Sequence, residues 1–321
     1  MNVFITRKIP QTAIDLLVNE GFDVSVYGKD NAAGKNILMK QTKDADGVIT
    51  LLNDRIDAEI IANMTRCRVI ANYAVGYNNI DIEAADKKKI IVTNTPDVLT
   101  ESTADLAVTL LLACSRRILE GHSMVVNGKF NGWKPELLLG VELKNKYAGI
   151  IGAGRIGTAA AKRLKAFGCK IIYFSRKRNP SLENETGAKK VNLDTLLKKS
   201  DFVSIHVPLN SETKFLLDKE KLSLLKPSAI IINTARGEIL DETALIQMLK
   251  EKKLFAAGFD VYTNEPEINK KLLKLKNVVL LPHLGSATVE ARGEMALLAA
   301  KNVINVLKGR KALTPVLSKN R

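Results

Sequence analysis

The stretch Gly149-Ile-Ile-Gly-Ala-Gly-Arg-Ile-Gly157 decides the fold of this 321-residue chain. It matches G-x-G-x-x-G, with an apolar strand predicted before it and an Ala/Lys/Arg-rich helix predicted after it. In that context the first glycine allows a tight turn, the second lets a pyrophosphate approach the backbone, and the third permits close packing of helix on strand. The helix N-terminus adds free N–H groups and a partial positive charge. A plain strand-to-helix turn is the alternative, but the context favours a dinucleotide site formed by Gly152, Gly154, Arg155, Ile156 and Gly157.

The next strand, expected at Cys169–Phe174, indicates which dinucleotide binds. NAD sites usually carry an Asp or Glu about 20 residues after the glycines, where it holds the ribose hydroxyls. Here no acidic residue occurs between Cys169 and Leu182, and the strand runs into Ser175-Arg-Lys-Arg178. A hydroxyl and a guanidinium can bind a 2′-phosphate through charge-assisted hydrogen bonds. A solvated basic loop is the alternative; we favour NADPH, with NADH possible, and expect contacts from Ser175, Arg176 and Lys177.

Composition excludes several classes of protein. The chain is 46% hydrophobic and 26% charged, which suits one or two domains with sizeable cores. No apolar run is long enough for a membrane span and no secretory signal pattern is found. The three cysteines lack metal-ligand spacing, so we expect reduced thiols, no metal and a cytoplasmic location. The net charge of +15 is spread along predicted helices and aromatic residues are only 5%, so we expect anionic small ligands, with neither nucleic acid nor membrane as partner.

Strand and helix patterns alternate along most of the chain, which predicts parallel sheets covered on both faces. This alternation begins well before the glycine motif, so the cofactor domain is not N-terminal. One long apolar helix is expected from about Glu101 to Val126, and a C-terminal helix from about Val289 to Leu307 is expected to cross back onto the first domain, followed by a loose tail from Lys308. We predict an α/β fold with two doubly wound parallel-sheet domains. A flavodoxin-like substrate domain spans residues 1–99 and 287–321, and an inserted Rossmann dinucleotide-binding domain spans residues 100–286.

Polar residues follow several predicted strands of the second domain, and ligands of open parallel sheets bind outside the carboxyl ends of the strands. A nicotinamide enzyme that reduces a carbonyl needs an acid near neutral pH, and His283 is the natural candidate. Glu265 can favour the protonated imidazole. Arg236 suits a substrate carboxylate and the polarised carbonyl. Surface ion pairs at strand ends are the alternative. His206 is expected to line the cofactor and not to catalyse.

Four motifs occur in order and with a specific spacing: Gly152-Ala-Gly-Arg-Ile-Gly157, Asn233-Thr-Ala-Arg-Gly237, Gly258-Phe-Asp-Val261 with Glu265-Pro266, and Pro282-His-Leu-Gly-Ser-Ala-Thr288. Together they resemble the D-isomer-specific 2-hydroxyacid dehydrogenase family, over essentially the whole chain. In that family a catalytic Arg, Glu and His match Arg236, Glu265 and His283. Asn72–Asp81 resembles the family's substrate loop, whose backbone N–H groups, here those of Val75 and Gly76, bind the substrate carboxylate.

Three further motifs narrow the resemblance to the glyoxylate/hydroxypyruvate reductase branch, which includes 2-ketogluconate reductases: Pro96-Asp-Val-Leu99, Thr103-Ala-Asp105 and Ser175-Arg176. The resemblance implies NADPH-dependent reduction of a short 2-keto acid to the D-2-hydroxy acid. Two alternatives are an NAD-linked dehydrogenase of the phosphoglycerate dehydrogenase type and a non-enzymatic corepressor that senses dinucleotide. Asn78 departs from the branch, which often has Asp there, and we expect it to change loop hydrogen bonding and not the chemistry.

The resemblance also implies a homodimer formed through the long helix and the loop after it, with Trp133 bordering the partner's substrate pocket. Packing of Trp133 within its own subunit is the alternative. The expected substrate contacts are Leu52, Val75, Gly76, Trp133, Arg236 and His283. Beyond the glycine loop and the basic strand end, the expected cofactor contacts are Thr103, His206, Val207, Pro208, Thr213, Thr234, Ala235, Arg236, Asp260, His283 and Gly285.

Overall fold

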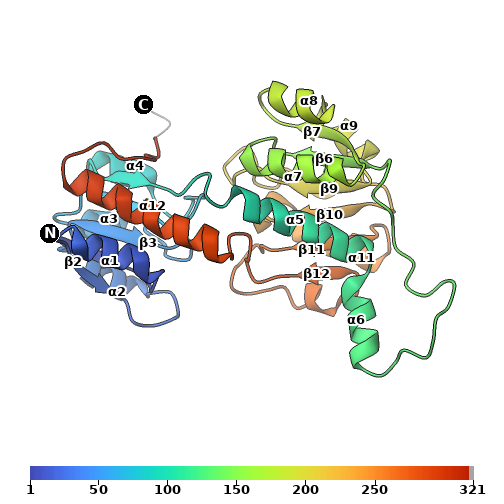
Figure 1. The fold of residues 1–321 in the computed structure, drawn as a ribbon, viewed down its shortest axis with the longest axis horizontal. Coiled ribbons are helices and arrows are strands. Elements are labelled where there is room, and N and C mark those ends of the chain that lie inside the picture. Colours follow the sequence, from blue (N-terminus) through green and yellow to red (C-terminus); the bar gives the residue numbers. More distant parts are fainter. Residues whose placement is uncertain (318–321) are drawn as a thin grey trace. The chain divides into compact units, whose positions relative to one another are not determined.

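The computed structural model describes residues 1–317, which form two compact units (Figure 1). One unit contains Met1–Leu99 with the segment from Ala287 onward, and the other is Thr100–Ser286. Each unit has one all-parallel sheet with helices, which confirms the predicted α/β class. Within residues 1–317 no helix is long and apolar enough to cross a membrane, and no three His, Cys, Asp or Glu side chains cluster as metal ligands.

The first unit has a five-stranded sheet in the order β2-β1-β3-β4-β5. Its strands are β1 (Asn2–Ile5), β2 (Asp23–Val26), β3 (Gly47–Thr50), β4 (Val69–Asn72) and β5 (Ile91–Thr93). Its helices are α1 (Gln11–Asn19), α2 (Lys35–Thr42), α3 (Ala58–Asn63), α4 (Ile82–Lys87) and α12 (Val289–Leu307). The sequence pattern did not predict α2, because its apolar residues are consecutive instead of spaced at helical intervals and its N-cap, Gly34, offers no capping side chain.

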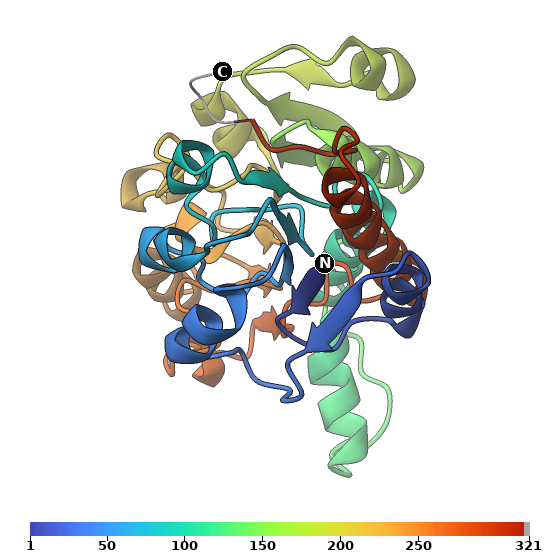
Figure 2. The same ribbon diagram turned by 90° about the vertical axis from the view of Figure 1, so that its left-hand side faces the viewer.

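The C-terminal helix α12 packs on the first unit, as predicted. Figure 2 shows it in red beside α1 in dark blue. It lies so close to β3 that a Cβ added to Gly47 would be 3.1 Å from a methyl carbon of Val303. The prediction of a loose tail from Lys308 is wrong for residues 308–317. Thr93 forms a bridge with Pro315, and the Val316 N–H donates to the Val92 carbonyl over 2.8 Å. Residues 318–321 lie outside the described residues.

The second unit has a seven-stranded sheet in the order β12-β11-β10-β9-β6-β7-β8. Its strands are β6 (Tyr147–Ile151), β7 (Lys170–Phe174), β8 (Lys189–Lys190), β9 (Phe202–Ile205), β10 (Ile230–Asn233), β11 (Ala256–Phe259) and β12 (Val278–Leu280). Its helices are α5 (Thr100–Ser115), α6 (Ile118–Val126), α7 (Arg155–Ala166), α8 (Pro180–Thr186), α9 (Leu193–Lys199), α10 (Lys219–Leu222) and α11 (Glu242–Lys250). The strand order reverses between β6 and β9, the place where doubly wound sheets bind their ligands.

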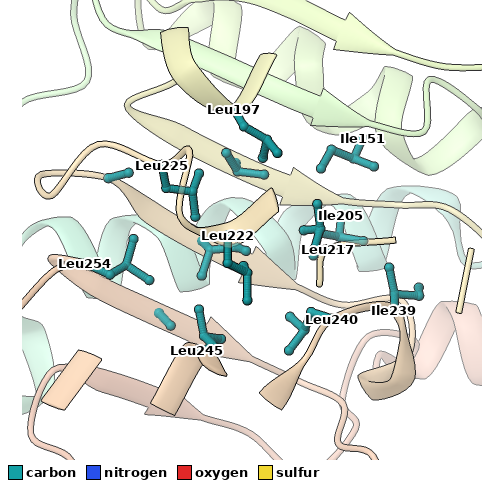
Figure 3. Packing of buried hydrophobic residues seen from close by; sticks show 14 of the residues in the cluster. Ile151, Leu197, Ile205, Leu217, Leu222, Leu225, Ile239, Leu240, Leu245 and Leu254 are labelled. Atoms are coloured by element: carbon teal, nitrogen blue, oxygen red, sulfur yellow. The ribbon is translucent and has the colours of Figure 1, made fainter. Parts of the chain in front are cut away.

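Both faces of the seven-stranded sheet are covered by apolar cores. On one face α5 and α7 pack against the sheet. On the other, leucines of α9, α10 and α11 pack against isoleucines of β6 and β9, as Figure 3 shows for Leu197, Leu222, Leu245, Ile151 and Ile205. Burial on both faces explains why these strands read as continuous apolar runs in the sequence.

The single helix predicted from Glu101 to Val126 is wrong, because the chain breaks between α5 and α6. Arg117 adopts a left-handed conformation, with φ of 53°. The Ser115 carbonyl accepts from the Val141 N–H over 2.9 Å, and a Cβ on Gly140 would lie 2.1 Å from the same oxygen. The returning chain therefore takes the place of the next helical turn. Beyond the break, α6 and the loop after it project from the rest of the second unit (Figure 1).

Candidate active site

The glycine loop between β6 and α7 lies at the point where the strand order reverses. Gly152 has φ of 98°, and a Cβ there would lie 2.7 Å from the His206 carbonyl carbon at the end of β9. A Cβ on Gly157 would lie 2.0 Å from the Gly152 carbonyl oxygen. At Gly154 an added Cβ would meet no atom within 4 Å, and this residue begins α7 without a capping side chain. Free N–H groups beside open space fit the pyrophosphate of a dinucleotide.

The end of β7 presents the predicted basic residues. The Arg176 side chain is 82% exposed, whereas the Arg178 guanidinium is bound to Glu183 over 2.6 Å. The Ser175 hydroxyl donates to the Lys177 carbonyl. One neighbour carries no signal in the sequence: Glu212, from the loop after β9, has a carboxylate oxygen 3.8 Å from Arg176. Since both side chains are exposed, this ion pair contributes about 0–1 kcal/mol, so Arg176 stays available to an anion.

The predicted acid and its carboxylate are brought together although they lie 18 residues apart. His283 Nδ1 is 2.8 Å from Glu265 Oε2, and the other carboxylate oxygen accepts from the Tyr262 N–H over 3.0 Å. Burial alone would raise the pKa of Glu265, but the hydrogen bond and the positive charge of protonated His283, together with the Tyr262 N–H, hold that pKa below its ordinary value. Glu265 is therefore ionised at neutral pH and can stabilise an imidazolium.

Asp260 supports the turn that carries His283. Its carboxylate is fully buried and accepts from the Leu284 N–H over 2.6 Å and the Gly285 N–H over 2.7 Å. His283 itself has φ of 59°, a left-handed conformation that the surrounding hydrogen bonds must hold. The Thr103 hydroxyl adds a bond to the Gly285 carbonyl over 3.0 Å. Burial raises the pKa of Asp260, although the hydrogen bonds from the Leu284 and Gly285 N–H groups act to lower it. Asp260 and Thr103 both hold this turn, and their predicted contact with the cofactor stays a prediction.

Arg236 lies on the turn after β10 and is partly buried. Its Nη1 donates to the Ala235 carbonyl over 2.6 Å, and the buried Asn233 side chain donates to the Arg236 carbonyl over 2.8 Å. A Cβ on Gly237 would lie 2.1 Å from the Tyr262 carbonyl carbon, so only glycine lets this turn pass beside the segment that leads to Glu265. Burial lowers the pKa of Arg236, and nearby carboxylates oppose that effect. A guanidinium nevertheless keeps its proton at any physiological pH.

The end of β9 supplies a neutral histidine. His206 Nε2 lies 2.8 Å from the Ser204 hydroxyl oxygen, and burial lowers the pKa of His206 to about 4. An imidazole that is neutral at physiological pH is a poor proton donor, in line with its expected role as lining. Next to it, Pro208 accepts from the Thr213 hydroxyl over 2.6 Å, and Val207 lies beneath Gly152. The Thr234 hydroxyl, after β10, is buried without a hydrogen-bond partner within residues 1–317.

The first unit carries the other expected substrate residues after β3 and β4. Leu52 lies on a turn in which the Asp54 N–H donates to the Leu51 carbonyl over 3.0 Å. Val75 and Gly76 follow β4 and are partly buried; neither N–H donates a hydrogen bond within residues 1–317. Two such free N–H groups can bind a carboxylate. Trp133 is 82% exposed, so the alternative in which it packs within its own subunit is wrong.

A dinucleotide loop at the reversal of a Rossmann sheet, with a carboxylate–imidazole pair at neighbouring strand ends, defines an NAD(P)-dependent oxidoreductase. Comparison with known proteins makes this more specific. Residues 108–285 match the NAD-binding domain of the D-isomer specific 2-hydroxyacid dehydrogenases. The chain belongs to this family of enzymes, as its motifs predicted.

Individual relatives cover nearly the whole chain. A glyoxylate reductase of Thermococcus litoralis is 50% identical over 96% of this chain and 94% of its own. The crystal structure of a glyoxylate reductase from Paecilomyes thermophila is 31% identical, with a TM-score of 0.87 and 98% of each chain covered. An NADPH-dependent glyoxylate/hydroxypyruvate reductase from Sinorhizobium meliloti, solved with NADP and malonate, is also 31% identical, with a TM-score of 0.86, covering 98% of this chain and 96% of its own.

Proposed function

We propose that this enzyme reduces glyoxylate and similar short 2-keto acids to D-2-hydroxy acids with NADPH. The observation that carries the proposal is the contact of 2.8 Å between His283 and Glu265 beside the arginine turn of β10. This arrangement suits proton delivery to a carbonyl oxygen that becomes an alkoxide. The relatives described as glyoxylate reductases support the same substrate class. The one from Thermococcus litoralis is 50% identical to this chain.

The roles of the protein groups follow from their chemistry. A bound nicotinamide supplies the hydride. Protonated His283 keeps its Nδ1 hydrogen bond to Glu265 and donates the Nε2 proton to the carbonyl oxygen. Arg236, permanently charged, binds the substrate carboxylate and polarises the carbonyl. We assign the free N–H groups of Val75 and Gly76 to the same carboxylate, and Leu52 and Trp133 to the sides of the substrate.

NADPH is proposed as the preferred cofactor. The exposed Arg176 with Ser175 and Lys177 offers a positive charge and donors where NAD enzymes carry a carboxylate. The Sinorhizobium meliloti relative is described as NADPH-dependent, in support of this. An NAD-linked dehydrogenase of the phosphoglycerate type lacks such support, and the corepressor alternative is disfavoured because the chain belongs to an enzyme family.

The test is a panel of glyoxylate, hydroxypyruvate and 2-ketogluconate, each with NADPH and NADH, on the parent enzyme and on His283→Asn. We expect saturable turnover with at least one of these acids and a loss of about 10²–10⁴-fold in kcat for the variant, the usual effect of removing a general acid. Cofactor affinity should change little. Absence of turnover with every acid, or an active His283→Asn variant, contradicts the proposal.

A further inference from the structure

The Val75 and Gly76 N–H groups, assigned to the substrate carboxylate, belong to peptide units whose carbonyls each accept a hydrogen bond. The Ala74 carbonyl accepts from the Thr95 N–H over 2.9 Å. The Val75 carbonyl accepts from the Asn94 side-chain amide over 2.8 Å. Both peptide bonds are trans, since the only cis bond among the described residues is Glu265-Pro266. In a trans peptide the carbonyl of one residue and the N–H of the next point in opposite directions.

It follows that these two hydrogen bonds orient the Val75 and Gly76 N–H groups, which we assign as donors to the substrate carboxylate. Holding the Ala74 carbonyl directs the Val75 N–H away from Thr95, and holding the Val75 carbonyl directs the Gly76 N–H away from Asn94. The first bond comes from backbone and exists whatever side chain is present. The second depends on one side chain, Asn94, which does not itself need to touch the substrate.

Asn94 is in turn fixed by the segment after α12. The Thr314 hydroxyl donates to the Asn94 carbonyl over 2.6 Å, and the Asn94 N–H approaches the Thr314 carbonyl at 3.3 Å. Asn302, fully buried on α12, holds Thr314: its amide donates to the Thr314 hydroxyl over 2.9 Å and its oxygen accepts from the Leu313 and Thr314 N–H groups over 2.9 and 3.1 Å. A continuous chain of hydrogen bonds thus runs from α12 through residues 313–314 to the loop after β4.

We propose that Asn94 is a positioning residue for the substrate carboxylate, and that Thr314 keeps it in place. The inference rests on the proposed function, because it takes the Val75 and Gly76 N–H groups as the carboxylate donors. It assigns a role in substrate binding to residues far from the substrate loop in sequence. The Thr314–Asn94 bond spans 220 residues.

Asn94→Leu is the decisive variant, because it keeps the branched shape and the neutrality of the side chain but cannot donate. We expect KM for the best 2-keto acid, and the inhibition constant of oxamate as a non-reacting 2-keto acid analogue, to rise by about 10- to 100-fold, the range for losing alignment of one hydrogen bond to a charged group. The kcat and the NADPH dissociation constant should stay close to those of the parent, since no group near the hydride or the proton is altered.

Asn63→Leu is the matched control. The Asn63 amide also donates to a single backbone carbonyl, that of Met39, over 2.6 Å, and it is also partly buried, but neither residue contacts the substrate loop. Its urea unfolding midpoint reports the stability lost with one such bond. We expect Asn63→Leu to lose comparable stability without a change in the oxamate constant.

Thr314→Val and Thr314→Ser provide a second route that does not depend on the folding of Asn94→Leu. Valine removes the hydroxyl at nearly constant volume and should raise the oxamate constant in the same direction, by a smaller factor. Serine should restore it. A change of stability alone in Thr314→Val, or no rescue by serine, overturns the role of Thr314.

The outcomes separate the inference from the proposed function. A parent enzyme that turns over no 2-keto acid and does not bind oxamate refutes the function. A parent that does both, with an oxamate constant raised no more by Asn94→Leu than by Asn63→Leu, leaves the function standing and overturns the inference. A fall in kcat as large as the rise in KM also overturns it, because it indicates general damage to the site.

Discussion

At the scale of single residues, the protonation of Glu265 sets the behaviour of the catalytic pair. Its pKa is held below the ordinary range, so the carboxylate is charged throughout the neutral region. The charged carboxylate lies 2.8 Å from His283 Nδ1 and orients the imidazole that we propose as the proton donor. Since the pKa of Glu265 is lowered, this contact should be kept as pH falls until Glu265 itself is protonated, and lost below that point.

Glu265→Gln should lower kcat/KM for reduction by about 10-fold or more, because the imidazole of His283 loses its charged hydrogen-bond partner. The kcat/KM of reduction at neutral pH measures the loss. Glu267→Gln is the control, since that nearby residue is exposed and His283 pairs with Glu265. An unchanged kcat/KM in Glu265→Gln removes this residue from the proposed role.

Cofactor choice is also decided by a few side chains. Ser175→Asp combined with Arg176→Ala should reverse the preference for NADPH, because a carboxylate replaces the donors of the 2′-phosphate. Losing a charge-assisted contact costs about 1.5–3 kcal/mol, or roughly 10- to 150-fold in kcat/KM with NADPH. Arg178→Ala should have little effect, since that guanidinium is already bound to Glu183. Equal efficiency of the parent with NADPH and NADH speaks against this prediction.

At the scale of elements, the connection from β6 to α7 contains glycines that are needed for two different reasons, one for the fold and one for ligand binding. Gly152 is required by the fold, because its φ is positive and the His206 carbonyl leaves no room for a Cβ. Gly154 has φ of −78° and open space around it, so no atom within residues 1–317 excludes a Cβ there. The space at the start of α7 is needed only if a ligand approaches the backbone.

Gly154→Ala should therefore fold with a stability close to that of the parent yet bind NADPH more weakly. Gly152→Ala should lose about 1–3 kcal/mol of unfolding free energy through backbone strain and overpacking. Urea unfolding and fluorescence titration with NADPH distinguish the two effects. Undiminished NADPH affinity in Gly154→Ala contradicts the assignment of the loop to the pyrophosphate.

At the scale of the whole molecule, α6 and the loop after it expose apolar side chains that nothing within residues 1–317 buries. No residue of α6 is buried, and Ile118, Leu119, Val125 and Val126 are about half exposed or more. Trp133, on the same excursion, is also exposed. A helix that is apolar on an exposed face requires something to cover it. We infer that a second copy of the chain does so, as the family resemblance implies.

We expect a dimer in sedimentation at micromolar concentration. Trp133→Ala should leave the dimer intact, because one side chain is a small part of such an interface, but raise KM for the 2-keto acid if this residue borders the partner's pocket. Phe130→Ala, an exposed aromatic residue on the same loop, is the matched comparison. A monomeric parent enzyme rules out this assembly, and an unchanged KM in Trp133→Ala rules out the shared pocket.

The sequence by itself determined the features that depend on residues close together in the chain. Strand and helix alternation, the glycine loop, and the placing of Arg236, Glu265 and His283 at strand ends all follow from local patterns. The parallel sheets then bring those strand ends to one edge, so even the pairing of Glu265 with His283 was predictable.

The tertiary structure alone decided what depends on contacts between distant segments. Asp260 beneath the His283 turn, Glu212 beside Arg176 and the break before Arg117 each arise because another part of the chain arrives at that point. The segment after α12 read as a loose tail because no apolar pattern marks it; it is ordered by hydrogen bonds to Asn302 and Asn94. A single polar side chain carries no periodic signal, so its partner becomes visible only when the backbone is in place.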